Sequence, residues 1–65
     1  MLKTIIIKDW TPQDDPHYSY WSGNELGCIR RYINKNYREY CIHENDIFYY
    51  KIFKNSTHVT INLEG

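Results

Sequence analysis

The side chains that could bind a metal ion are scattered along the chain: Cys28, Cys41, His17, His43 and His58. Structural zinc sites take their ligands in close pairs, such as two cysteines separated by two residues. Only Cys41 and His43 form a close pair here. We therefore expect no metal site and no cofactor, and we interpret the two cysteines as buried thiols that pack like small apolar groups.

The same pair is the best available starting point for nucleophilic catalysis. A cysteine nucleophile needs a neighbouring histidine and a third group that orients the imidazole ring. Glu39 or Glu44 could be drawn as that third group only because each is close in sequence. A domain of 65 residues has little room for a cleft that excludes water, and its three glycines match no phosphate-binding motif. The sequence therefore predicts a protein that is not an enzyme.

The segment 9–21 (DWTPQDDPHYSYW) is the strongest candidate for binding a partner. Its two prolines fix φ and remove backbone donors, so the segment is predicted to be a loop. Loops of this length are usually functional or disordered, and its Trp and Tyr residues argue against disorder. Trp and Tyr dominate interface hot spots, and the aspartates could pair with basic groups of a partner. The predicted partner-binding residues are Trp10, Asp14, Asp15, Tyr18 and Tyr20. The alternative is a solvated loop tip whose aromatic rings pack into the core.

A second candidate surface is a basic cluster next to tyrosines. Basic groups interleaved with aromatic rings can bind single-stranded nucleic acid through phosphate contacts and base stacking. The residues of this alternative nucleic-acid site are Arg30, Arg31, Arg38 and Tyr49. No known RNA-binding signature is present, and a solvated helix face is the competing interpretation.

Composition sets the limits for these candidates. The chain of 65 residues predicts one domain, 1–65, with a thin stability margin that its eleven aromatic residues partly offset. Eight basic residues balance eight acidic ones, so the formal net charge is zero. Neither a phosphate-binding protein with an overall positive field nor a DNA mimic with a negative one is expected, although a local patch remains open.

No secretory signal pattern or membrane-spanning run is apparent. A membrane helix needs roughly 20 consecutive apolar residues, and no stretch approaches that length. We therefore expect a cytoplasmic protein with both thiols reduced.

The helix that would carry the basic cluster is predicted over 23–35. Ser22 and Glu25 have the spacing of a capping box, and Trp21 and Leu26 have that of a hydrophobic staple. Apolar residues then recur at helical spacing through Ile29 and Ile33. The staple gives Trp21 a structural role. A strand through 28–33 is the competing interpretation.

The remaining elements are predicted to be strands. The segment 2–8 is rich in β-branched residues and apolar on both faces, which is typical of a strand inside a sheet. Three more strands are predicted at 37–44, 47–53 and 58–64, with the second in the sheet interior and the alternating third at an edge or half-exposed. The fold class is α+β in the order β-α-β-β-β, with a mainly antiparallel sheet and one helix packed on one face.

One helix can cover only one face of such a sheet. The other face would expose apolar side chains over an area that is unusual for a monomer. The cover could be the loop folded back, a second copy of the chain in a homodimer, or a foreign partner.

These observations favour a small protein-binding module that acts by steric binding. Short chains without net charge and rich in Lys, Asn, Ile and Tyr are common among phage and mobile-element accessory proteins that inhibit or redirect a host enzyme. The alternative function is binding of RNA or single-stranded DNA. No membrane partner is expected.

Overall fold

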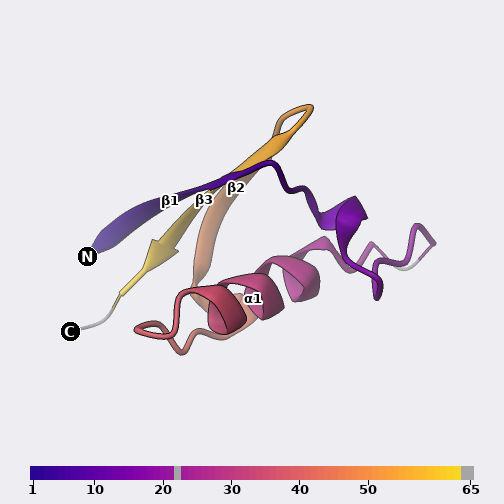
Figure 1. The fold of residues 1–65 in the computed structure, drawn as a ribbon. Coiled ribbons are helices and arrows are strands. Elements are labelled where there is room, and N and C mark those ends of the chain that lie inside the picture. Colours follow the sequence, from indigo (N-terminus) through magenta and orange to yellow (C-terminus); the bar gives the residue numbers. More distant parts are fainter. Residues whose placement is uncertain (22, 64–65) are drawn as a thin grey trace.

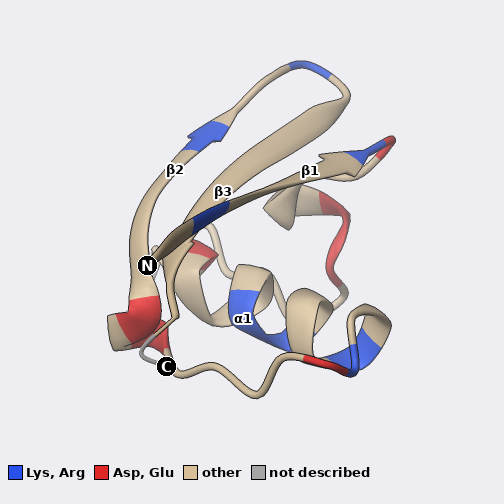
Figure 2. Ribbon diagram, turned by 90° about the vertical axis from the view of Figure 1, so that its left-hand side faces the viewer, with Lys and Arg blue, Asp and Glu red and all other residues tan. Residues whose placement is uncertain are grey.

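The computed structural model describes residues 1–21 and 23–63, which form one α-helix and a three-stranded antiparallel sheet (Figure 1). The strands are β1 (Leu2–Lys8), β2 (Ile47–Ile52) and β3 (Ser56–Asn62), the helix is α1 (Glu25–Asn36), and two 3-10 turns are η1 (Pro12–Asp14) and η2 (Glu44–Asp46). Figures 1 and 2 show α1 on one side of the sheet only. The predicted α+β class, with one helix packed on one face, is confirmed.

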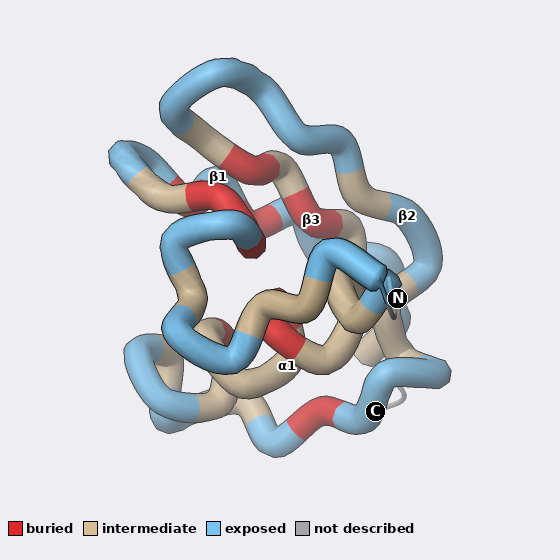
Figure 3. Tube along the Cα trace, turned by 90° about the vertical axis from the view of Figure 1, so that its right-hand side faces the viewer, coloured by how far each residue is buried: buried red, intermediate tan, exposed pale blue. Residues whose placement is uncertain are grey.

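The core lies between α1 and the sheet and consists mainly of β-branched side chains. Ile29 and Ile33, one helical turn apart, are fully buried on α1. They pack in one cluster with Ile5, Ile7, Ile42, Val59 and Ile61. Figure 3 shows the buried positions on α1, β1 and β3, whereas β2 carries none. Burial of each such side chain contributes about 1.5–3 kcal/mol, so a core of this size leaves a small stability margin.

The strand order is β1-β3-β2, with β3 in the centre. The prediction that 47–53 lies inside the sheet is therefore wrong, since β2 is an edge strand. The segment 58–64 was predicted to be an edge or half-exposed strand, and β3 is half-exposed but central. The expected alternation in β3 is present, with Val59 and Ile61 buried. It arises because one face of the sheet is uncovered, and an uncovered face gives a central strand the same alternating pattern as an edge strand.

The first strand is also at an edge, where the sequence predicted an interior position. Ile5 and Ile7 point into the core, whereas Ile6 is 51% exposed on the opposite face. We call the face of the sheet that points away from α1 the outer face. The loop 9–21 does not fold across it, which excludes the first of the three covers considered above. Within the described residues nothing else covers the outer face.

The segment 37–44 does not form the predicted strand. The side chain of Asn34 binds both backbone groups of Ile42: Nδ2 donates to the carbonyl oxygen and Oδ1 accepts from the N–H, each at 2.9 Å. These are the hydrogen bonds that a neighbouring strand would otherwise provide. The segment is thereby held against the end of α1, and Ile42 is buried in the core.

The helix begins two residues later than predicted, and its N-cap is Asn24. The proposed capping box involves Ser22, which lies outside the described residues. Glu25 accepts a hydrogen bond from the hydroxyl of Tyr50 on β2. The proposed staple is wrong, because Trp21 is almost fully exposed instead of packing on Leu26. Among the described residues no helix combines the length and the apolar content needed to span a membrane.

The Asn34 clamp on Ile42 is testable by mutation. We expect Asn34→Ala to lower the free energy of unfolding by about 1–3 kcal/mol, because two part-buried backbone groups of Ile42 lose their partners. Asn36→Ala is the matched control: it lies in the same last turn of α1, and its amide makes only an exposed bond to the Tyr32 carbonyl. Urea unfolding should show a change of less than about 0.5 kcal/mol for the control. Equal losses would contradict a specific clamp.

The Tyr50–Glu25 bond predicts a dependence of stability on alkaline pH. Burial raises the pKa of the Tyr50 phenol, and the hydrogen bond to Glu25 and its charge raise that pKa further. The folded protein thus holds this proton more tightly than the unfolded chain. The stabilisation is fully present below about pH 10 and falls as the pH rises toward the pKa of the folded state. We expect Tyr50→Phe to be less stable than the wild type by about 0.5–1.5 kcal/mol at pH 7. Urea titrations between pH 7 and 11 should show this gap narrowing above pH 10, and a constant gap would be inconsistent with the assignment.

Candidate functional site

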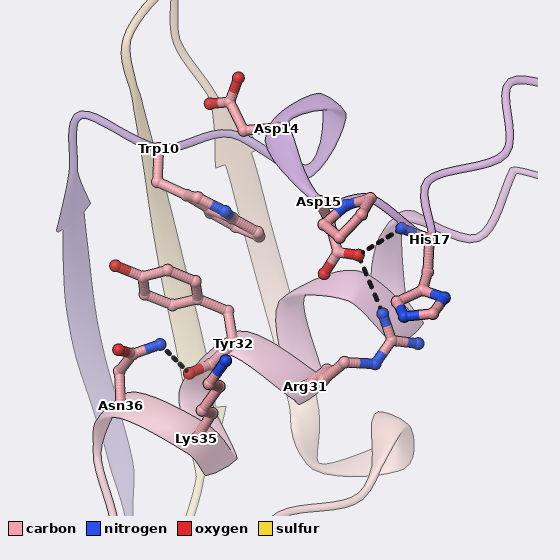
Figure 4. Close-up of a pocket in the computed structure, with 9 residues that line it drawn as sticks. Trp10, Asp14, Asp15, His17, Arg31, Tyr32, Lys35 and Asn36 are labelled. Atoms are coloured by element: carbon pink, nitrogen blue, oxygen red, sulfur yellow. Dashed lines mark hydrogen bonds and ion pairs between the residues drawn. The ribbon is translucent and has the colours of Figure 1, made fainter.

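The connection between β1 and α1 is held on the helix by one carboxylate. Asp15 Oδ1 accepts from Arg31 Nη1 at 3.0 Å and from the backbone N–H of His17 at 2.7 Å (Figure 4). The Asp15 side chain is nearly buried, whereas that of Arg31 is partly open to solvent. The carboxylate therefore closes the loop onto α1 and is not free to meet a partner.

The start of the connection is anchored in the same way. The ring of Trp10 lies against that of Tyr32 on α1, with centroids 4.4 Å apart. The fully buried Thr57 donates from Oγ1 to the Trp10 carbonyl at 3.0 Å. Asp14 closes η1 by accepting from the N–H of Thr11 at 2.9 Å. Three of the five predicted partner-binding residues, Trp10, Asp14 and Asp15, thus hold the loop in its conformation.

A pocket of about 370 Å³ lies between this connection and α1. It is lined by Trp10, Asp14, Asp15, Pro16, His17, Arg31, Tyr32, Lys35 and Asn36. Figure 4 shows the Asp15–Arg31 ion pair at one side of the pocket and the stacked Trp10 and Tyr32 rings at the other. Asp15 and Arg31 neutralise each other at one side of the pocket, whereas Asp14 and Lys35, which also line it, form no ion pair among the described residues.

The tip of the connection is held by a second asparagine clamp. Asn24 Nδ2 donates to the His17 carbonyl, and Asn24 Oδ1 accepts from the N–H of Ser19, each at 2.8 Å. Beyond this clamp the side chains of Tyr20 and Trp21 are 76% and 96% exposed. Their rings meet edge to face with centroids 6.2 Å apart. The clamp therefore presents an adjacent aromatic pair on a fixed base.

Of the remaining predicted residues, Tyr20 belongs to this exposed pair and Tyr18 is half-buried below it. The sequence analysis missed Trp21, because the apparent staple assigned it to the helix. The signal that could have found it is the N-cap preference of Asn24. With Asn24 as N-cap, the residue in the staple position is Gly23, which has a φ of 59°. Trp21 is then left free of the helix.

The predicted nucleic-acid residues are not brought together. Arg31 is paired with Asp15, and Arg38 is exposed beyond the end of α1. Tyr49 pairs with Thr60 and points to the outer face, whereas its neighbour Tyr50 points toward the helix. The sheet therefore separates Tyr49 from the arginines of α1, including Arg30.

The two cysteines differ in their surroundings. Both are free; Cys28 is buried as expected, but Cys41 is exposed, so the prediction of two buried thiols is wrong for Cys41. Burial raises the pKa of the Cys28 thiol, and the negative charge of Asp15 raises it further, partly opposed by Arg31. Within the described residues no three His, Cys, Asp or Glu side chains are close enough together to hold a metal ion.

Comparison with known proteins gives no match for this chain: neither a protein-family model, nor a curated protein, nor a solved structure matches it.

The different burial of the two thiols predicts selective labelling. Cys41 should be alkylated by iodoacetamide at pH 8 in the native protein, because it is exposed. Cys28 should react only when the protein opens, because it is buried and its raised pKa lowers the thiolate fraction. Peptide mass spectrometry after timed labelling measures both sites, with a urea-unfolded sample as the control in which they react alike. Rapid labelling of native Cys28 would contradict its burial.

Proposed function

We propose that this chain is a small, non-catalytic protein-binding module that docks onto another protein through Tyr20 and Trp21. The observation that carries the proposal is the almost complete exposure of Trp21 beside an exposed Tyr20. Trp and Tyr are enriched among the residues that contribute most to protein–protein affinity. Each presents a large apolar area with only two side-chain torsions to fix on binding.

The loop that carries Tyr20 and Trp21 is already ordered before any partner binds. The Asn24 clamp, the Asp15–Arg31 ion pair and the Trp10–Tyr32 contact all fix the base of the connection against α1. A loop that is already ordered loses less conformational entropy when it binds, so more of the contact energy appears as affinity. Because these contacts engage the aspartates within the chain, we place the docking surface at Tyr20 and Trp21 and not at Asp14 and Asp15.

The complementary surface on the partner is an apolar or aromatic pocket able to take an indole ring. Asp14 and Asp15 are engaged within the chain, so no acidic contact with the partner is required. The proposed action is steric: the module covers a surface of an enzyme, or stabilises a complex, without turnover. Steric binding of this kind would suit an accessory protein of a phage or mobile element that inhibits or redirects a host enzyme, which is the role we propose.

The proposal is tested by comparing proteins captured from a cell lysate by the wild type and by Tyr20→Ala/Trp21→Ala. The double variant should lose the captured partner, with affinity reduced at least about 30-fold, because removal of a hot-spot residue costs roughly 2 kcal/mol or more. Its far-UV circular dichroism should be unchanged, because neither side chain is buried.

The matched control is Phe48→Thr, which removes an exposed aromatic ring from β2 and should leave capture intact. A partner retained equally by the tip variant and the wild type would show that the tip is not the docking surface.

A further inference from the structure

The zero net charge conceals a separation of charge between the sheet and the rest of the molecule. The strands and the β2–β3 turn (residues 1–8 and 47–63) carry Lys3, Lys8, Lys51 and Lys54 and no acidic residue. Residues 9–46 carry four basic and seven acidic residues. Figure 2 shows blue charged positions on the strands and on the β2–β3 turn, whereas red positions lie on the connections that follow β1 and precede β2 and on the helix side of the molecule. The local patch that the total charge left open is therefore on the sheet.

The outer face combines part of this positive charge with exposed rings. Lys8 and Lys51 point outward and Lys54 lies in the β2–β3 turn, whereas Lys3 is paired with the buried Ile61 and points to the side of α1. Residues paired across antiparallel strands point to the same side, so the register defines rows on the face. From one end to the other they are Leu2 and Asn62; Thr4, Thr60 and Tyr49; Ile6, His58 and Lys51; and Lys8, Ser56 and Phe53. Tyr49 is 58% exposed and Phe53 is 41% exposed.

The rings and cations on this face are in direct contact. The ammonium group of Lys51 lies 5.3 Å from the centroid of the Phe53 ring. The same ring also contacts the imidazole ring of His58, with centroids 4.5 Å apart. Tyr49 lies on β2, four residues before Phe53, which directly follows the strand, so the two are roughly 13 Å apart along the chain. The two rings are thus far enough apart to take separate bases, with a lysine between them.

We propose that the outer face binds single-stranded nucleic acid, with bases stacked on Tyr49 and Phe53 and phosphates paired with Lys8, Lys51 and Lys54. Exposed rings on a sheet bind bases of any type, and lysines beside them neutralise the backbone. This surface is separate from the Tyr20–Trp21 tip, so it does not depend on the docking function proposed above.

The positive charge of the outer face favours a nucleic acid over a second copy of the chain as its binding partner. A face-to-face dimer would bring the lysines of both copies together in a desolvated interface with no carboxylate to offset them. A single-stranded nucleic acid supplies the missing negative charge together with flat apolar bases. An acidic protein segment supplies the charge without the bases, so the experiment must separate these two.

The test measures the fluorescence anisotropy of labelled 12-nucleotide single strands, DNA and RNA of the same mixed sequence, titrated with the full chain. Saturable binding of either strand is expected at 50 mM salt. With about three phosphate contacts, the slope of log K against log salt should be near −2, so affinity should fall roughly 20-fold between 50 and 200 mM salt. A duplex of the same sequence should bind more weakly, because its bases are already stacked.

Variants assign the binding to the outer face. Tyr49→Thr/Phe53→Thr keeps a β-branched residue in or beside the strand. It should reduce affinity at least about 30-fold, because each of the two stacked bases contributes roughly 1–3 kcal/mol. Lys51→Gln/Lys54→Gln should bring the salt slope close to −0.7. Lys35→Gln is the matched control, because it removes an exposed cation from α1, and it should change neither value. Thermal unfolding confirms that each variant is folded, and amide NMR shifts of the wild type locate the site independently of any variant.

Several results would overturn the proposal. One is the absence of saturable binding below about 100 μM protein at 50 mM salt. Another is equal affinity for the duplex and the single strand. A third is an equal change of the salt slope in the Lys35 variant and in the Lys51/Lys54 variant. Displacement of the oligonucleotide by polyglutamate as efficiently as by unlabelled strand would show a general polyanion or acidic-protein surface instead. NMR shifts confined to α1 or to the tip would place any binding elsewhere.

Discussion

The packing of a single helix on a single face of the sheet is the constraint on which the rest of this structure depends. Ile29 and Ile33 seal the inner sides of β1 and β3, and the described part of the chain contains no second α-helix for the other side. Every side chain that alternates away from α1 is therefore left facing solvent. The small core and the exposed rings of the outer face both follow from this one contact. It also explains why β3 can be the central strand although one of its faces is polar.

The irregular half of the chain is ordered by side chains instead of by regular hydrogen-bond ladders. Asn24 at the start of α1 holds the loop at His17 and Ser19, and Asn34 near its end holds Ile42. Arg31, between them, holds Asp15. Each clamp satisfies loop groups that would otherwise face the protein unpaired, and buried or part-buried polar groups are expensive to leave without partners. The segments before and after α1 are thus both attached to the helix by side-chain hydrogen bonds. Because the segment before α1 is held in this way, Tyr20 and Trp21 lie at a fixed position.

The sequence predicted those features that depend on local pattern. The helical spacing of Ile29 and Ile33, the β-branched run of β1 and the prolines of the loop each indicated the correct element. It failed where a distant partner decides the outcome. The strand at 37–44 was wrong because one amide of Asn34 replaces a neighbouring strand, and no periodicity reports such a bond. The strand 47–53 was placed in the interior because it is apolar on both faces, and the alternation of 58–64 did not distinguish an edge strand from a central strand with one open face. In the loop, the sequence did not show that Asp15 is engaged within the chain, since its ion pair with Arg31 is a contact across sixteen residues.

The exposed apolar side chains of the outer face make association between copies of the chain more favourable, so their presence needs an explanation. Large side chains such as Ile6, Tyr49 and Phe53 stay exposed in a protein whose core is small, and both edge strands offer unpaired backbone groups to other chains. The lysines on β1 and β2 oppose the pairing of these edges between copies, because like charges would meet. Protection of the edges accounts for the lysines, since lysine is the charged residue most used on natural edge strands. It does not account for the rings of Tyr49 and Phe53 beside them, because exposed rings make an open face more prone to association. The proposed nucleic-acid surface accounts for both, since it uses the lysines for phosphates and the rings for bases.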